Sequence, residues 1–304
     1  FEYLILNPKL EVTQYDDYPL EIKIEGHVIP SEVFIVINGN SFRIKSTGSA
    51  TFEYLFKAVK NDVLFQFLAG GYLSKHYTLK AFPQPKVVDL NVFLNYPEYT
   101  KIKDESIKNN GDLIIPEGTI VHWNASLENT KNVTLIFSQN KHHQITEKTF
   151  SYKKQFFSST AYQIIPLNEY QLSDSLSYFI KVIPDAYPLI EVTQAFDSTN
   201  SQFVFNGEIK DDYLLKELTF NYRISNNDTS PLVSQKIPIQ QLSNELFFFN
   251  FKFNDLLLAA GTEIKYYFEV WDNDGINGSK NTKSNHFLYK EADKDELIAK
   301  KDAE

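Results

Sequence analysis

The chain has 304 residues, and 42% of them are hydrophobic and 15% aromatic. Its formal net charge of −9 repels phosphate backbones, and no cluster of Lys or Arg offsets this charge locally, so nucleic acid is excluded as an expected partner. The absence of cysteine excludes disulfides, thiolate metal ligands and cysteine nucleophiles.

The sequence offers no candidate for a membrane span. Its longest apolar stretches, at 246–253 and 256–260, are far shorter than the roughly 18 to 20 residues that cross a bilayer. Methionine is also absent, including an initiator, which leads us to expect a segment excised or processed from a longer chain. We therefore expect membrane contact only through segments outside this sequence.

Size and residue types favour several β-domains. A chain of this length suits two or three domains, each large enough to bury its own core. The 18 Tyr and 25 Phe favour strands, because bulky side chains pack well on a pleated, half-buried surface. We predict an all-β protein of tandem immunoglobulin-like or fibronectin-type β-sandwiches, with domains at 1–83, 84–184 and 185–290.

The first predicted domain opens with the motif Pro8-Lys-Leu-Glu-Val-Thr-Gln14, which we interpret as its first strand. The segment Leu20-Glu-Ile-Lys-Ile-Glu25 alternates apolar and charged residues, as a half-buried strand requires. Further strands are predicted at 34–37, 42–44, 52–56, 63–68 and 76–81. The pair Gly70-Gly71 predicts a hairpin turn, because glycine reaches positive φ without a Cβ clash.

The second predicted domain opens with a looser copy of the motif, Pro85-Lys-Val-Val-Asp-Leu-Asn-Val92. Strands are predicted at 113–115, 119–125, 133–137, 150–157, 162–165 and 176–182. The prolines before each copy of the motif fix φ and keep the preceding residue extended, which predicts stiff joints between domains.

The third predicted domain repeats the first motif closely, as Pro188-Leu-Ile-Glu-Val-Thr-Gln194. Strands are predicted at 202–209, 218–224, 234–239, 245–253, 263–271 and 284–289. In the run at 245–253, four phenylalanines at alternate positions share one face and indicate a core strand. The charged segment 291–304 predicts the start of a solvated C-terminal helix.

One loop has the composition of a metal site. In Asp272-Asn-Asp-Gly-Ile-Asn-Gly278, oxygen-bearing side chains alternate around a glycine, which is what calcium requires, and Asp272, Asp274 and Asn277 are the candidate ligands. The alternative is a hairpin loop, where Asn, Asp and Gly are favoured for their turn conformations. Lys283 stands where an EF-hand has its bidentate acid. Both interpretations remain open, and no other cofactor is expected.

The sequence contains no catalytic signature. The pairs Asp16-Asp17 and Asp211-Asp212 resemble paired carboxylates, but adjacent residues of an extended chain point to opposite faces, so we interpret them as turn residues. Neither a nucleophile elbow nor a phosphate-binding loop occurs. We therefore predict no catalytic and no cofactor-binding residues within this chain, which is expected not to be an enzyme.

The third domain resembles a known family through Pro184-Asp-Ala-Tyr-Pro-Leu-Ile-Glu-Val192, Asn206-Gly-Glu-Ile-Lys-Asp-Asp-Tyr213 and above all Tyr266-Tyr-Phe-Glu-Val-Trp-Asp-Asn-Asp-Gly275. These segments are similar to a family of large Bacteroidota envelope proteins of unknown function. The resemblance implies a periplasmic or cell-envelope location, with an inner-membrane anchor outside this chain. It implies a β-rich middle region followed by a charged helical region, and it supplies no catalytic residues.

Three functions follow as hypotheses. The first is a non-enzymatic scaffold or protein-binding segment of a larger membrane-anchored protein, with other envelope proteins as partners. The second is a carbohydrate-binding or adhesive array, suggested by the aromatic content, although the preferred stacking residue, tryptophan, occurs only at Trp123 and Trp271. The third is an accessory β-region of an enzyme whose catalytic domain lies outside this chain.

Overall fold

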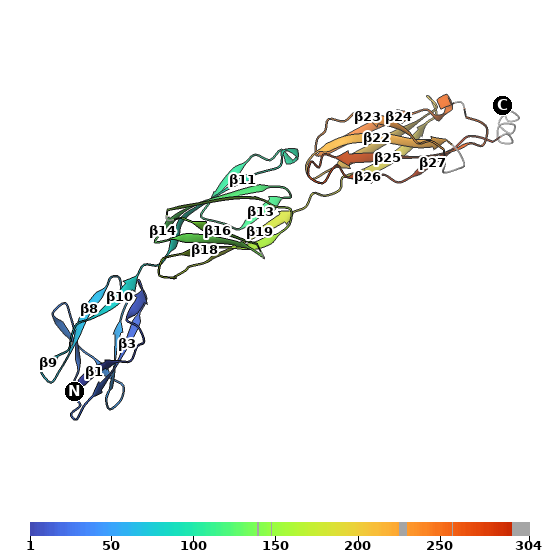
Figure 1. Ribbon diagram of the computed structural model, residues 1–304. Helices are drawn as coiled ribbons and strands as arrows, with labels where there is room; N and C mark the ends of the chain where they lie inside the picture. The colour runs from blue at the N-terminus through green and yellow to red at the C-terminus, as the bar shows by residue number, and fades with distance from the viewer. Residues whose placement is uncertain (139, 147, 225–229, 257, 294–304) are drawn as a thin grey trace. The chain divides into compact units, whose positions relative to one another are not determined.

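A computed structural model describes the chain except residues 139, 147, 225–229, 257 and 294–304. The described part is all-β, with two short 3-10 helices, η1 (Glu98–Thr100) and η2 (Phe253–Leu256). Its strands form three successive pairs of sheets, coloured blue, green and orange in Figure 1. Most of the C-terminal segment predicted as a helix, residues 294–304, lies outside the described residues.

The first pair of sheets is built from residues 2–82. One sheet has the order β1-β3-β7-β6, comprising β1 (Glu2–Ile5), β3 (Tyr18–Glu25), β7 (Thr51–Phe56) and β6 (Lys45–Ser46). The other has the order β2-β10-β8-β4-β5, comprising β2 (Glu11–Thr13), β10 (Tyr77–Phe82), β8 (Val63–Ala69), β4 (Phe34–Ile37) and β5 (Asn40–Arg43), with β9 (Tyr72–Leu73) paired to β8. We call this pair the first sandwich.

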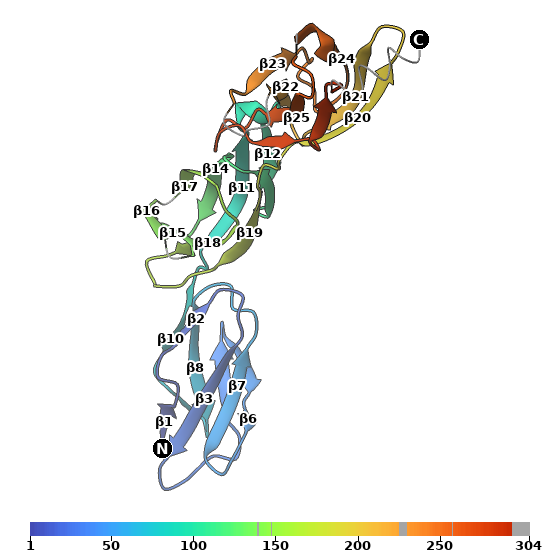
Figure 2. The same cartoon turned by 90° about the vertical axis from the view of Figure 1, so that its right-hand side faces the viewer.

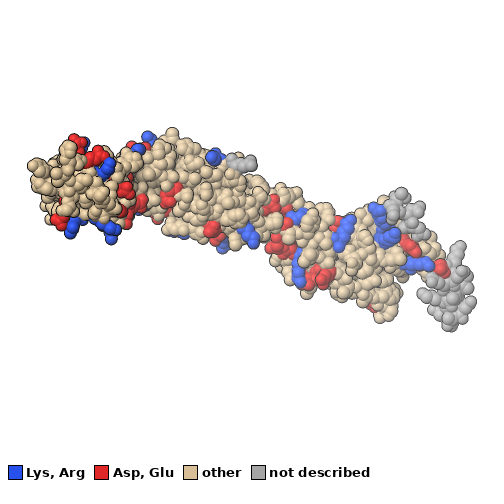
Figure 3. Space-filling view, turned by 90° about the horizontal axis from the view of Figure 1, so that it is seen from below, with Lys and Arg blue, Asp and Glu red and all other residues tan. Residues whose placement is uncertain are grey.

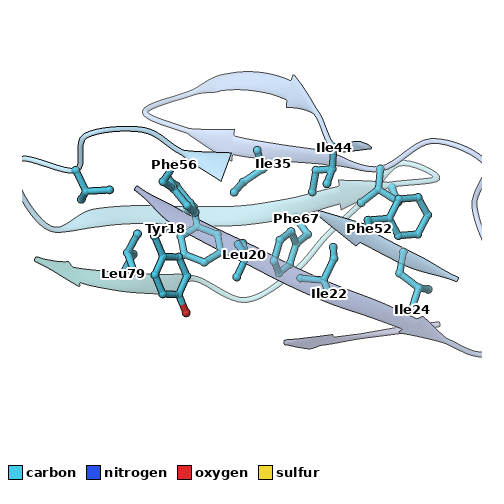
Figure 4. Close-up of a cluster of buried hydrophobic side chains, with 14 of the residues drawn as sticks. Tyr18, Leu20, Ile22, Ile24, Ile35, Ile44, Phe52, Phe56, Phe67 and Leu79 are labelled. Atoms are coloured by element: carbon cyan, nitrogen blue, oxygen red, sulfur yellow. The ribbon is translucent and has the colours of Figure 1, made fainter. Parts of the chain in front are cut away.

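Alternation along the strands builds the core of the first sandwich. Leu20, Ile22 and Ile24 of β3 are each 1% exposed, while the intervening charged residues face outward. They meet Ile35 and Phe67 from the opposite sheet, as Figure 4 shows. The predicted hairpin turn is confirmed, since Gly70 and Gly71 have φ of 55° and 82° between β8 and β9.

One prediction for this sandwich is wrong. The motif at Pro8–Gln14 does not form the first strand, because Glu2–Ile5 precedes it as β1, and the motif supplies only the three-residue β2. β2 pairs in parallel with β10 in one sheet, whereas β1 pairs with β3 in the other sheet. The chain therefore changes sheets between β1 and β2, at the segment that contains Pro8, whose nitrogen has no hydrogen to donate to a ladder.

The second pair of sheets spans residues 86–183. One sheet has the order β12-β11-β14-β17, comprising β12 (Glu105–Lys108), β11 (Lys86–Asn95), β14 (Ile120–Glu128) and β17 (Thr149–Gln155). The other has the order β13-β19-β18-β15-β16, comprising β13 (Leu113–Pro116), β19 (Leu176–Ile183), β18 (Thr160–Leu167), β15 (Asn132–Phe137) and β16 (Asn140–Ile145). As in the first sandwich, one short strand, β13, joins its sheet in parallel, next to β19.

The third pair of sheets, the third sandwich, spans residues 189–290. One sheet has the order β20-β21-β24, comprising β20 (Leu189–Asp197), β21 (Gln202–Lys210) and β24 (Asn244–Phe251), which lie side by side in Figure 2. The other has the order β23-β22-β25-β26, comprising β23 (Val233–Ile237), β22 (Leu215–Ile224), β25 (Glu263–Asp272) and β26 (Asn281–Lys283), with β27 (Phe287–Lys290) also paired to β25.

An aromatic core fills the third sandwich. Phe205 of β21 is fully buried, with its ring centroid 5.1 Å from that of Phe268 and 5.8 Å from that of Tyr266. The packing is close enough to require glycine at position 207, where a Cβ atom would lie 2.3 Å from the Phe247 ring. The prediction that the odd-numbered phenylalanines of this run face inward is confirmed, since they pack against this core.

Tertiary contacts divide the chain into two compact units. One comprises Phe1–Leu90, Asn124–Ser151 and Ala161–Tyr178, and the other comprises Asn91–Trp123, Tyr152–Thr160 and Phe179–Glu304. The first sandwich falls within the first unit and the third sandwich within the second. The domain boundaries at 83/84 and 184/185 stay predictions from the sequence.

Candidate functional site: a carboxylate cluster in the third sandwich

The topology of the third sandwich gathers several acidic segments at one end. The start of β20 lies opposite the end of β21, because Leu189 pairs with Lys210. In the other sheet, the start of β22 lies opposite the end of β25, because Leu215 pairs with Asp272. The segment before β20, the β21–β22 loop and the loop after β25 therefore converge. They carry the residues that we call the carboxylate cluster: Asp185, Asp211, Asp212, Asp272 and Asp274, with Lys280.

Lys280 is the cation at the centre of this cluster. Its Nζ lies 2.9 Å from Asp274 Oδ2 and 3.4 Å from Asp272 Oδ2, and it also donates a hydrogen bond to Asp185 Oδ2. The Lys280 side chain is 15% exposed, and those of its three partners are 0 to 2% exposed. Among the ion pairs of the described residues, no other basic side chain contacts these carboxylates.

The predicted calcium loop is folded by its own carboxylates. Asp272 Oδ1 accepts hydrogen bonds from the backbone N–H groups of Asp274 and Lys280, at 3.1 and 2.8 Å. Asp274 Oδ1 accepts from those of Ile276 and Asn277, at 2.7 and 3.1 Å. The structure thus brings Asp272 and Asp274 together, whereas Asn277 is exposed and joins them only through its backbone.

Two further carboxylates reach the cluster from other segments. Asp211 Oδ2 accepts a hydrogen bond from the N–H of Tyr213, and Asp212 Oδ2 accepts one from that of Ala186. The two side chains of this pair differ, since Asp211 is partly buried and Asp212 belongs to an exposed residue. Asp211 thus forms an Asx turn with Tyr213, in accord with its interpretation as a turn residue, and is in addition partly buried.

Four buried oxygen atoms here have no hydrogen-bond partner among the described residues. They are Asp185 Oδ1, Asp211 Oδ1 and Asn273 Oδ1, together with Asp272 Oδ2, which has Lys280 Nζ at 3.4 Å as an ion-pair partner. Buried polar atoms in proteins are nearly always satisfied, so four such oxygens at one end of a sandwich indicate an excess of acceptors over donors. In the described part of the chain, no group of three or more His, Cys, Asp or Glu side chains stands ready to hold a metal ion.

Burial and repulsion shift the ionisation of this cluster. Burial raises the pKa of Asp185 to about 6, against the opposing effect of Lys280, and burial with the nearby charge of Asp212 raises the pKa of Asp211 to about 6. Burial also opposes ionisation of Asp274, but hydrogen bonds from Lys280 and two backbone amides outweigh it and hold the pKa of Asp274 below its usual value. For Lys280, its acidic partners likewise outweigh burial and raise its pKa.

These shifts predict a pH dependence of stability. Because the folded state raises the pKa values of Asp185 and Asp211 from 3.8 to about 6, it holds protons that the unfolded chain releases. The contribution of these two groups is therefore fully present below about pH 4 and is lost as the pH rises towards 6. We expect the urea midpoint of the third sandwich, measured in EDTA by segment-resolved hydrogen exchange, to fall over this range. In Asp211→Asn the urea midpoint should fall less steeply with pH. An unchanged slope would contradict the raised pKa of Asp211 as a cause of the fall.

Two further surface features lie in the first and third sandwiches. The first sandwich has a groove of about 710 Å³ lined by aromatic and polar side chains, among them Tyr3, Tyr72, Lys75 and Tyr77. In the third sandwich, β24 is an edge strand with exposed Leu246 and Phe248.

Charged residues of both signs are interspersed on the face seen in Figure 3, without a broad basic patch. No helix of the described residues is long and apolar enough to cross a membrane.

Sequence reasoning located part of the site. It singled out Asp272 and Asp274, interpreted the pair Asp211-Asp212 as turn residues, and missed Asp185 and Lys280. Asp185, Asp211 and Lys280 lie in different segments, and only the pairing of β20 with β21 and of β22 with β25 brings them to one end. The available signal was positional: Asp185 precedes the predicted first strand of the domain, and Asp211 follows the predicted strand at 202–209.

Comparisons with known proteins show similarity of fold. No family model and no curated protein matches the chain. The mouse nectin-like molecule 4 ectodomain (Ig1–Ig3) is 8% identical, with 93% of this chain and 97% of that chain covered and a TM-score of 0.37. A 1.5-MDa bacterial ice-binding adhesin is 10% identical, with 93% of each chain covered and a TM-score of 0.34.

A third similar structure comprises the FN1–FN3 domains of chicken CNTN1, at 9% identity and a TM-score of 0.25, with 95% of this chain and 98% of that chain covered. At such identities the similarity concerns fold alone. The paired sheets described above already show that fold, which is a tandem array of immunoglobulin-like and fibronectin type III-like β-sandwiches.

Proposed function

We propose that the chain is a non-catalytic scaffold segment that binds other cell-envelope proteins by strand addition to β24. The observation that supports the proposal is that one side of β24 is unpaired among the described strands and bears exposed apolar side chains. β24 has eight residues and pairs with β21 on one side, and no described strand pairs with its other side. Leu246 is 83% exposed and Phe248 is 61% exposed.

The edge of β24 lacks the usual protection against pairing. Natural edge strands carry lysine, proline or a bulge that discourages the addition of another strand. β24 has no lysine and no proline, and its one charged residue, Glu245, is engaged by the backbone N–H groups of Gln240 and Leu242. By contrast, the edge strand β23 of the other sheet carries Lys236.

The occupant that fits this edge is an extended segment of a partner protein. Its backbone would hydrogen-bond to the unpaired groups of β24, and alternate apolar side chains would cover Leu246 and Phe248. Next to them on the outer face lie Glu208, which pairs in register with Leu246, and Glu191, which pairs with Glu208.

The location is part of the same proposal. It is supported by the similarity of residues 184–275 to the Bacteroidota envelope family described above. On that basis the chain belongs to the periplasm or cell envelope, and segments outside it anchor the protein to the inner membrane.

In the test, the chain is used to capture proteins from envelope extracts. Hydrogen exchange then locates the contact on the chain. We expect a captured protein to protect the amides of β24 from hydrogen exchange, and the double substitution Leu246→Lys with Phe248→Lys to abolish its capture. Leu288→Lys is the matched control, because Leu288 is 56% exposed on a strand of the opposite sheet. Capture that persists in the double variant, or protection elsewhere in the chain, would refute strand addition at β24.

Glycan binding is the second candidate, and the groove in the first sandwich favours it. The ring of Tyr72, a residue 72% exposed, stands at 90° to that of Phe1 with their centroids 6.3 Å apart, and Glu2, Ser74 and Lys75 supply polar groups beside them. Exposed rings with adjacent polar groups are suited to sugars. A glycan array that responds to the chain but not to its Tyr72→Ala variant would establish this function, and a silent array would remove it.

A further inference from the structure

We propose that Asn277, in the loop after β25, is a site of spontaneous covalent modification, at which its side-chain amide is converted through a succinimide to aspartate and isoaspartate. The reaction consumes only water, and it is fastest where the next residue has no side chain. Asn277 is followed by Gly278, and both residues are exposed. The site lies in a loop of the third sandwich and does not depend on strand addition at β24.

The chemistry uses two groups of the chain itself. The backbone nitrogen of Gly278 attacks Cγ of Asn277, so that an N–Cγ bond forms and the Cγ–Nδ2 bond breaks. The amide nitrogen leaves as ammonia and takes with it the proton of the attacking N–H. Water then opens the succinimide ring at one of its two C–N bonds, which gives aspartate or isoaspartate. Glycine favours the attack because no Cβ crowds its nitrogen.

The structure leaves both reacting groups free. Neither the side-chain amide of Asn277 nor the N–H of Gly278 makes a hydrogen bond among the described residues. Asn277 is held only at its own backbone N–H, which donates to Asp274 Oδ1 at 3.1 Å. Gly278 has a φ of 90°, and a Cβ at this position would meet no atom within 4 Å. The two groups can therefore rotate towards each other without breaking a strand ladder.

Three other Asn-Gly pairs of the chain serve as internal controls, and two of them lie in paired strands or a closed turn. Asn206 belongs to β21, which pairs with β20 on one side and with β24 on the other, so its backbone can rotate only when the sheet opens. Asn38 and Gly39 form the two-residue turn between β4 and β5, with φ of 49° and 79°, and the pair Ile37–Asn40 closes this turn.

The third control is constrained through its side chain. Asn110 Oδ1 accepts a hydrogen bond from the N–H of Asp112 at 2.9 Å, which holds the amide, and Gly111 is buried. Of the four pairs, only that at Asn277 lies outside both a strand ladder and a closed turn and also has a side-chain amide that makes no hydrogen bond among the described residues. The four pairs share the same local chemistry, so the fold decides which one reacts.

Modification at this position acts on the carboxylate cluster. It adds a carboxylate to a loop in which Asp272 and Asp274 already share the ammonium group of Lys280. Isoaspartate also lengthens the main chain by one carbon between Asn277 and Lys280, whose N–H donates to Asp272 Oδ1 at 2.8 Å. Aspartate adds the charge alone. We therefore expect isoaspartate to weaken the anchoring of Lys280 more than aspartate does.

The experiment is storage of the whole folded chain at mildly alkaline pH, followed by peptide mapping with mass spectrometry. We expect Asn277 to be converted at least about tenfold faster than Asn38, Asn110 or Asn206, because an opening free energy of about 1.4 kcal/mol already slows a protected site by that factor. In urea that unfolds the chain, the four rates should converge. Chromatographic separation of the aspartyl and isoaspartyl peptides measures the two products.

Two variants separate the reaction from its consequence. Asn277→Gln lengthens the side chain and disfavours ring closure, so it should stop conversion here and leave the other three pairs unchanged. Asn277→Asp reproduces the added charge without the extra backbone carbon, and its melting temperature should lie between those of the fresh and the converted chain. Conversion of Asn277 no faster than that of Asn38 or Asn206 in the folded chain, or the same ranking in urea, would overturn the proposal. Equal melting temperatures of the fresh and converted chains would overturn the effect on Lys280.

Discussion

Replacing Phe205 with alanine is expected to destabilise the third sandwich by about 3 to 5 kcal/mol, because it removes a buried ring and leaves a cavity. Phe205 is fully buried in the centre of the aromatic core, between the rings of Phe220, Phe249 and Phe268. Those rings come from three different strands of both sheets, so collapse around the cavity requires movement of the sheets themselves. Segment-resolved hydrogen exchange in increasing urea measures the loss.

Phe248→Ala is the matched control for this prediction. It removes the same side chain from the same sheet, but Phe248 faces outward and is 61% exposed. Substitutions at exposed positions change stability by roughly 0.5 kcal/mol or less. Equal effects of the two substitutions would show that the core does not lie where the structure places it.

Removing the cation of the carboxylate cluster is expected to have an effect of similar size. In Lys280→Ala, the carboxylates of Asp185, Asp272 and Asp274 lose their ammonium partner while they remain buried. Breaking a buried ion pair from one side costs about 3 to 5 kcal/mol, because the remaining charge is uncompensated. We expect a loss of this order in the free energy of unfolding of the third sandwich, measured by urea titration in EDTA at pH 7.

The position of the lysine is what matters in this prediction. Lys283→Ala also removes a lysine near the end of β25, but that residue is exposed, with its Nζ 4.9 Å from the ring centroid of Tyr267, and the expected loss is roughly 0.5 kcal/mol. Adding Asp274→Asn to Lys280→Ala should recover part of the stability, since it removes one uncompensated charge. A loss in Lys280→Ala no larger than that in Lys283→Ala would rule out a central role for this ion pair.

Much of the fold could be predicted from local pattern. Alternation in Leu20 to Glu25 and in Phe247 to Phe251 correctly indicated which side chains face the core, because the two faces of a strand see different environments. The copies of the Pro-Lys-Leu-Glu-Val motif were less reliable. Copies with similar residues occupy a three-residue parallel strand, β2, in one sandwich and a nine-residue edge strand, β20, in another. Pairing partners decide that difference, and they lie far away in the sequence.

For the candidate surfaces too, local sequence indicated part of the arrangement and the tertiary structure decided the rest. The outward direction of Leu246 and Phe248 follows from the alternation of the run, but their importance depends on β24 being an unpaired edge, which only the strand order reveals. Local composition also singled out Asp272 and Asp274. It gave no reason to join them with Asp185 or Asp211, which are distant in sequence.

The sequence by itself determined the class of this protein: an all-β chain of tandem sandwiches, acidic, without cysteine, and with a polar loop after Trp271. These properties depend on residue types and short periods, which act within a single strand or turn. Only the tertiary structure decided that three distant acidic segments meet around Lys280, which forms ion pairs with Asp185, Asp272 and Asp274. The reason is physical: burial and charge repulsion arise from neighbours in space, and antiparallel pairing places those neighbours at positions that no local pattern encodes.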